Sequence, residues 1–94
     1  METEKTEKPI WKQRYLISLK EDLTIVDIKI LRGVSTSVAL EIRKNAIEHM
    51  EKEFNGKVFI KPKTKVSAEA VFAVTGHDEE YYLKKMMAER KALN

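Results

Sequence analysis

The chain has 94 residues, of which 43% are hydrophobic and 35% charged, with 18 Lys and Arg against 15 Asp and Glu, a net charge of +3. This length predicts one domain with a thin core, and the apolar fraction is too high for a wholly disordered protein. The absence of Cys excludes a disulfide framework, a thiolate metal site and a Cys nucleophile.

The N-terminal residues are charged and lack an apolar stretch, so we expect no secretory signal there. Residues 1–9 are expected to form a mobile polar tail that ends at Pro9. No apolar run approaches the ~20 residues that a membrane-spanning helix needs. We therefore expect a cytoplasmic protein that does not interact with a membrane.

The first predicted element is a short strand over residues 10–19. Tyr15, Ile17 and Leu19 alternate with Leu16 and Ser18, and such alternation is typical of a strand.

Residues 23–32 predict a helix. Thr24 is a candidate N-cap, and Asp27 follows three residues later, as in a capping box. Gly33 then ends the helix, because glycine readily adopts the left-handed conformation of a helix C-terminus.

The longest predicted helix covers residues 36–54, which contain neither Gly nor Pro. Ser35 or Thr36 can cap it, and Asn55 with Gly56 ends it. On a helical wheel one face is apolar, with Ala39, Ile42, Ala46, Met50 and Phe54. The opposite face carries Ser37, Leu40, Glu41, Lys44, Glu48 and Glu51.

A small basic hairpin is predicted next, with residues 57–61 and 65–66 joined by a turn at residues 62–64. The lysines are Lys57, Lys61, Lys63 and Lys65, and no acidic residue lies between Phe54 and Ala68. These four lysines exceed the whole net charge, so the positive charge is concentrated here. The alternative interpretation is a solvated edge strand in which Lys and Pro prevent edge-to-edge pairing.

Two helices are predicted at the C-terminus. Ser67 caps residues 68–74, which Gly76 closes, and Asp78 caps a last helix that ends near Ala92. The last helix has an apolar stripe, which either packs on its own domain or contacts another protein or a second copy. The stripe consists of Tyr82, Leu83, Met86, Met87 and Leu93.

The order of these elements predicts an α+β fold, a small winged helix-turn-helix domain over residues 10–76 followed by a C-terminal amphipathic helix over residues 77–94. The turn at residues 32–35 suits a helix-turn-helix, although Lys29 and Arg32 stand where this motif usually has a small and an apolar residue. An ordinary antiparallel helix pair is the alternative.

A helix-turn-helix would bind double-stranded DNA, with the outward side chains of its second helix in the major groove. Those side chains are Thr36, Ser37, Leu40 and Lys44, while Arg43 at the helix edge can contact phosphate. On a hairpin, Lys57, Lys61, Lys63 and Lys65 would contact the DNA backbone, which makes binding salt-dependent.

Enzymatic chemistry is not indicated. His49 and His77 lack the spacing of metal ligands, and nothing pairs a nucleophile with a base. We therefore expect no catalytic residue, no metal and no cofactor.

Several short segments resemble small excisionase-like proteins. Such proteins are encoded beside tyrosine recombinases on phages and integrative elements. The same segments are shared with MerR-like regulators. The segments are residues 24–28 (TIVDI), 31–35 (LRGVS), 42–44 (IRK) and 66–71 (VSAEAV) with Gly76, and 9–11 (PIW) with Arg14 and Tyr15.

The resemblance implies a winged-helix accessory factor that binds beside a recombination site, distorts it and favours excision. It also implies that the C-terminal helix contacts a tyrosine recombinase. Tyr82, Met86 and Met87 of the apolar stripe would make this contact, or a contact with a second copy. A transcriptional or plasmid copy-number regulator with the same DNA-binding surface is one alternative. A protein-binding adaptor or phage inhibitor without DNA activity is another.

Overall fold

The computed structural model describes residues 10–55 and 57–93, with the side chain of Leu93 left out. The predicted tail, residues 1–9, lies outside the described residues, as does Gly56. In chain order the elements are α1 (Ile10–Ser18), β1 (Asp22–Leu23), α2 (Ile25–Arg32), α3 (Thr36–Phe54), β2 (Val66–Ser67), α4 (Ala68–Thr75) and α5 (Glu79–Leu93). The predicted α+β class is confirmed.

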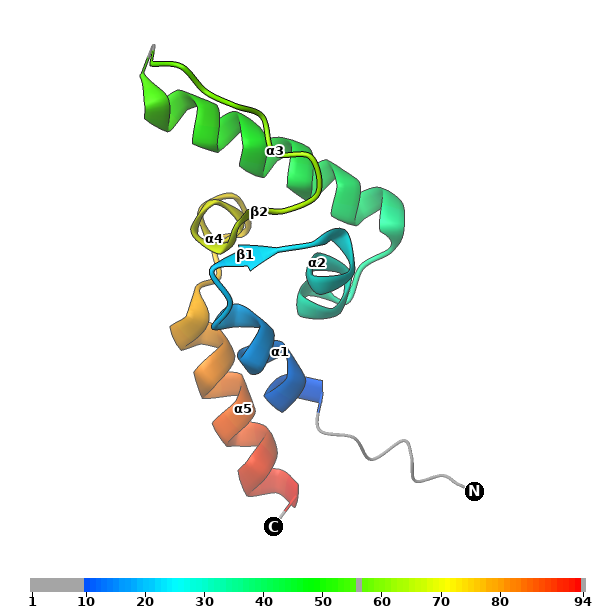
Figure 1. Ribbon diagram of the computed structural model, residues 1–94. Coiled ribbons are helices and arrows are strands. Elements are labelled where there is room, and N and C mark those ends of the chain that lie inside the picture. Colours follow the sequence, from blue (N-terminus) through cyan, green and yellow to red (C-terminus); the bar gives the residue numbers. More distant parts are fainter. Residues whose placement is uncertain (1–9, 56, 94) are drawn as a thin grey trace.

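The helices form two groups on either side of a minimal sheet (Figure 1). The long helix α3 packs on α4 and α2, while α1 packs on α5 and α2. Between them β1 and β2 pair antiparallel, with Asp22 opposite Ser67 and Leu23 opposite Val66. This two-residue ladder joins the chain before α2 to the chain before α4.

One hydrophobic core connects the two groups, because helices from both contribute fully buried side chains. The two strands contribute Leu23 and Val66, and α5 contributes Tyr82, whose side chain is 0% exposed. The other buried apolar residues are Ile17, Ile28, Leu31, Ala39, Ala46, Ile47, Ala68, Ala70 and Val71.

The start of α2 is the predicted capping box. The Thr24 hydroxyl accepts a hydrogen bond from the Asp27 backbone N–H at 3.1 Å, and the Asp27 carboxylate accepts one from the Thr24 N–H at 3.0 Å. The Lys20 ammonium lies 3.0 Å from the same carboxylate. At the other end Gly33 has φ +62°, so the predicted left-handed cap is confirmed.

We expect Asp27 to make the fold acid-sensitive. Burial acts to raise the pKa of Asp27, but the hydrogen bond from Thr24 and the charge of Lys20 outweigh it, so the pKa lies below its usual value. A lowered pKa stabilises the fold above about pH 4, and this contribution is lost as pH falls through the folded-state value. Asp27→Asn should lower the free energy of unfolding by about 1 kcal/mol at pH 7.

Urea unfolding of both proteins between pH 2 and pH 7 measures this effect. The difference between Asp27→Asn and the parent protein should shrink toward acid pH, because the parent carboxyl is then protonated. A difference that stays constant over this range would show that the charge of Asp27 contributes nothing.

The long helix α3 and the helices after it also begin at the predicted capping residues. Ser35 caps α3, accepting from the Val38 N–H at 3.4 Å, and Asn55 ends it with φ +50°. Ser67 caps α4, and the Asp78 carboxylate accepts from the Tyr81 N–H in the first turn of α5. The predicted polar face of α3 is exposed throughout, including Leu40, whereas Ala39 and Ala46 on the opposite face are buried.

The strand predicted over residues 10–19 is wrong, because residues 10–18 form the helix α1. The free N–H groups of Trp11 and Lys12 donate to one carboxylate oxygen of Glu89 in α5, at 3.0 and 3.2 Å. This carboxylate from the far end of the sequence caps α1. The rings of Trp11 and Tyr82 lie 6.4 Å apart between the two helices. Packing on α5 therefore stabilises a helix for which the local sequence has no cap.

The predicted hairpin is also wrong. Residues 57–65, all of which the structure describes, contain no strand, and Val66 pairs with Leu23 instead. That pairing buries both side chains, whereas an isolated two-stranded hairpin is marginally stable. Pro62 lacks the N–H that a ladder would use. Residues 57–65 form a lysine-bearing loop, which returns alongside α3 to β2 (Figure 1); we call it the basic loop.

Among the helices that the structure describes, none has the length and apolar character required to cross a membrane.

Candidate nucleic-acid interface

The helices α2 and α3 are held in a fixed relation by a short turn and shared core contacts. Ile28 and Leu31 of α2 and Ala39 of α3 are buried in the same core. The turn depends on Gly33, because its φ of +62° is left-handed and a Cβ atom at this position would also lie 2.6 Å from Nη2 at the end of the Arg14 side chain. Arg14 itself donates from Nε to the Ile30 carbonyl at 2.8 Å. The orientation of α3 is therefore fixed by the end of α2 and by α1.

The outward face of α3 places the predicted major-groove residues at the surface. Thr36, Ser37, Leu40 and Lys44 are all exposed. Ser37 lies close to the cap, with its hydroxyl 3.4 Å from that of Ser35. This face combines hydroxyl groups, one cation and one apolar side chain with the carboxylates of Glu41, Glu48 and Glu51.

The basic loop lies beside this face and is attached to α3 at two points. Nη2 of Arg43 donates to the carbonyls of Pro62 and Lys63, at 3.0 and 2.7 Å. The Phe54 and Phe59 rings meet edge to face, with centroids 4.9 Å apart. Arg43, which the sequence predicts as a phosphate contact, is half-buried and holds the loop. The four predicted lysines, Lys57, Lys61, Lys63 and Lys65, are all exposed.

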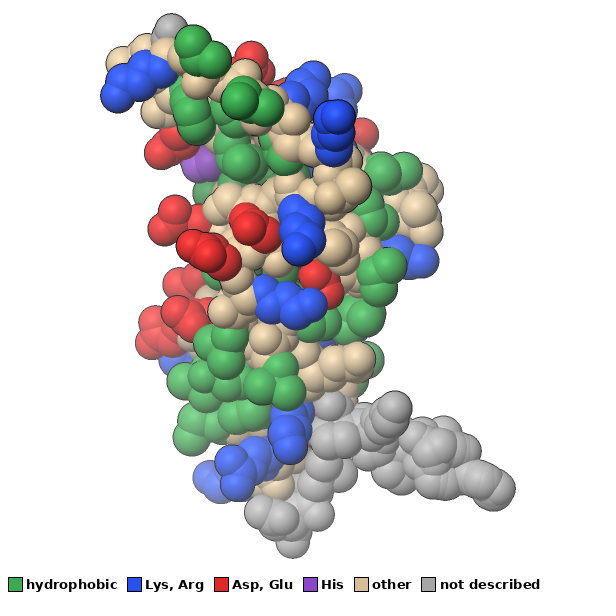
Figure 2. Space-filling view, in the orientation of Figure 1, with side chains coloured by type: hydrophobic (Ala, Val, Ile, Leu, Met, Phe, Trp, Pro, Cys, Tyr) green, Lys and Arg blue, Asp and Glu red, His purple; other side chains and the backbone are tan. Residues whose placement is uncertain are grey.

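Charge is distributed unevenly over the surface. In the view of Figure 2, Lys and Arg side chains lie along the loop over α3 and down the middle, whereas many acidic side chains lie on the left flank beside α4 and α5. Glu69, Glu79 and Glu80 line a depression on that flank. The basic loop therefore favours a polyanion, whereas α3 itself has four acidic residues, Glu41, Glu48, Glu51 and Glu53, against Arg43, Lys44 and Lys52.

A groove of about 380 Å³ separates the N-terminal end of α2 from α3 and the basic loop. Val26 and Leu40 line it, and both are strongly exposed for apolar residues, at 62% and 49%. Val26 was not singled out from the sequence. Its position two residues before Ile28 could have placed it away from the buried face of α2. The full lining is Thr24, Ile25, Val26, Leu40, Arg43, Lys63 and Thr64.

Arg32, which departs from the usual motif, has a structural role. Its Nη1 lies 2.6 Å from Nδ1 of His77 and donates to the hydroxyl of Tyr82 at 3.0 Å. The His77 ring stacks on Tyr81 with centroids 3.8 Å apart. Burial raises the pKa of Tyr82, and the neighbouring Arg32 acts in the opposite direction. Arg32 thus joins the end of α2 to the start of α5.

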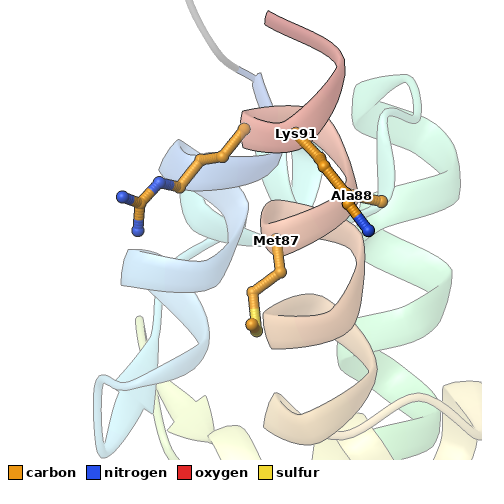
Figure 3. Close-up of a pocket in the computed structure, with 4 residues that line it drawn as sticks. Met87, Ala88 and Lys91 are labelled. Atoms are coloured by element: carbon orange, nitrogen blue, oxygen red, sulfur yellow. The ribbon is translucent and has the colours of Figure 1, made fainter. Parts of the chain in front are cut away.

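The predicted partner surface on α5 is changed by this arrangement. Tyr82 is buried and cannot contact a partner, whereas Met86 is half-buried and Met87 is exposed. Hydrophobic side chains gather over α5 and α1 in Figure 2. Met87, Ala88 and Lys91 project from α5 around an open pocket of about 600 Å³, which Arg90 also lines (Figure 3).

Comparisons of the chain with protein-family models, with curated proteins and with solved structures give no match.

Proposed function

We propose that the protein is a small winged helix-turn-helix protein that binds double-stranded DNA. In this proposal α2 and α3 form the helix-turn-helix, α3 enters the major groove, and the basic loop takes the place of the wing against the backbone. The single observation that carries the proposal is the attachment of a loop with four exposed lysines to α3 itself, through Arg43. A change in the orientation of α3 would therefore move the lysines with it.

The division of contacts follows from side-chain chemistry. Thr36 and Ser37 can donate to phosphates or base edges at the start of α3, and Lys44 suits a phosphate or a guanine edge. Lys57, Lys61, Lys63 and Lys65 supply contacts that do not depend on sequence. Neutralising each phosphate releases counterions, so affinity should fall steeply with salt.

Binding of a fluorescent 25-base-pair duplex over a series of salt concentrations tests the proposal. The variant with Lys61, Lys63 and Lys65 all changed to Ala should lose about tenfold or more in affinity at low salt, and its log–log salt slope should fall by about 2–3. The loss of affinity should be similar for duplexes of different sequence, because all duplexes offer the same phosphate contacts.

A matched control removes three lysines elsewhere. Lys12, Lys84 and Lys91 lie exposed on α1 and α5, and changing all three to Ala gives the same change in net charge. If both triple variants lose affinity equally, the loop has no special role. If the parent protein binds with no dependence on salt, the DNA-binding proposal fails.

For the biological role we propose an excisionase-like accessory factor that directs site-specific recombination on a mobile element. The resemblance at residues 24–35 and 66–71 supports this role over transcriptional or copy-number control, which would use the same surface. Exposed Met87 and half-buried Met86 are the proposed contact with a tyrosine recombinase or a second copy. A tyrosine recombinase gene beside this one is the first expected result, and stimulation of excision in a purified reaction with that recombinase is the second. No stimulation of excision would favour the regulator.

A further inference from the structure

The groove between α2, α3 and the basic loop holds apolar side chains where a DNA-binding surface is expected to be polar. Leu40 is an apolar residue on the otherwise polar outer face of α3, and Val26 of α2 lines the same groove. Ile25 adds to the apolar lining. Exposed apolar side chains that converge from two helices indicate an apolar group as the ligand.

The charges at the groove select the kind of molecule that carries this group. Arg43 and Lys63 line the same groove, and no acidic residue is among its lining residues. Since the Arg43 guanidinium is held by two loop carbonyls, its charge stays in place. An apolar group on a polyanion fits this combination better than an apolar protein surface, which would leave both cations desolvated.

The sequence of α3 further limits which apolar group of a polyanion the groove can receive. Arg, Asn, Gln and Lys, the residues that most often form paired hydrogen bonds with bases, are absent from residues 36–42 (TSVALEI). The first two turns of the helix therefore offer hydroxyls, one carboxylate and Leu40. In the major groove only thymine presents an apolar group, its 5-methyl.

Resting on the proposed DNA binding, we propose that this groove receives the 5-methyl group of a thymine, with Leu40 and Val26 as specificity-determining contacts. Lys63 at the rim would contact a phosphate near that base. An A·T pair would then be preferred at one position of the site, because the other bases present no methyl group to the groove.

The test begins with duplexes selected from a random pool by the parent protein. Each thymine of the selected site is then replaced by deoxyuridine, which removes only the methyl group. At one position per bound copy the parent protein should lose about fourfold in affinity, because one methyl group is no longer buried on binding. Leu40→Ala should bind the thymine and deoxyuridine duplexes with equal affinity.

Two further variants separate this contact from a general loss of structure. Leu40→Met keeps an apolar side chain and should keep the sensitivity to the methyl group. Val38→Ala changes another exposed apolar residue of α3, one that does not line the groove. This variant should also keep the sensitivity to the methyl group. Thermal unfolding should be similar for all three, because Leu40 and Val38 lie at the surface.

The inference is overturned if no thymine is sensitive in the parent protein, or if Leu40→Ala loses as much affinity on methyl removal as the parent does. In both cases salt-dependent DNA binding can persist, so the proposed function would stand. If the parent protein binds no duplex at low salt, the proposed function fails and this inference with it.

Discussion

Replacing Tyr82 with alanine should lower the free energy of unfolding by about 3–5 kcal/mol, the usual cost of deleting a buried aromatic side chain. The ring is fully buried and lies within 5.1–6.5 Å of the rings of Trp11, Phe72 and Tyr81, between centroids. A domain of this length has a total stability of about 5–14 kcal/mol, so the variant should lose a substantial part of it. Urea unfolding followed by circular dichroism measures the effect.

A conservative variant separates packing from hydrogen bonding. Tyr82→Phe keeps the ring and removes only the hydroxyl that accepts from Arg32, which should cost about 1 kcal/mol. Truncation after Gly76 removes the whole of α5 and should have at least the effect of Tyr82→Ala. A truncated protein that stays folded and binds DNA would show instead that α5 is a separate interaction arm.

Much of this fold could be predicted because its signals are local. Thr24, Ser35 and Ser67 each cap a helix through a hydrogen bond to a backbone N–H three residues later. Gly33 and Asn55 end their helices in the left-handed conformation. A capping interaction of this kind involves only a few neighbouring residues, so it is visible in the sequence, and the helices it starts and ends were placed within one or two residues.

The two errors have a common cause, because the stabilising contacts lie far apart in the sequence. The N-terminus of α1 is capped by Glu89, and β2 pairs with β1 rather than with the neighbouring segment. Short alternating segments such as residues 15–19 and 57–61 have no strong preference of their own. Packing on α5 makes the first of these segments part of a helix. The burial of Leu23 with Val66 favours the pairing of β1 with β2 over a hairpin that includes residues 57–61.

The candidate interface was also predicted in part. The exposed face of α3 follows from its helical periodicity, and the four lysines are exposed, although they lie on a loop and not on the predicted hairpin. Arg43 could not be assigned from sequence, since its partners are loop carbonyls 19 and 20 residues away. The groove at Val26 and Leu40 depends on how α2 crosses α3, which periodicity alone does not give.

The turn between α2 and α3 leads to the last prediction, that Gly33→Ala should lower the free energy of unfolding by about 2 kcal/mol. Part of the cost is the left-handed backbone, at φ +62°. The rest arises because the new Cβ would displace the Arg14 guanidinium, which is held by its hydrogen bond to the Ile30 carbonyl and lies 4.6 Å from the centre of the Trp11 ring.

Gly76→Ala is the matched control. Gly76 has φ +79°, but a Cβ there would meet nothing within 4 Å, so only the backbone cost of about 1 kcal/mol applies. Urea unfolding of both variants therefore isolates the effect of Arg14, and equal losses would show that Arg14 moves aside freely. Because Gly33 also sets the direction of α3, its variant should lose DNA affinity under conditions in which it is still folded, whereas Gly76→Ala should bind as the parent does.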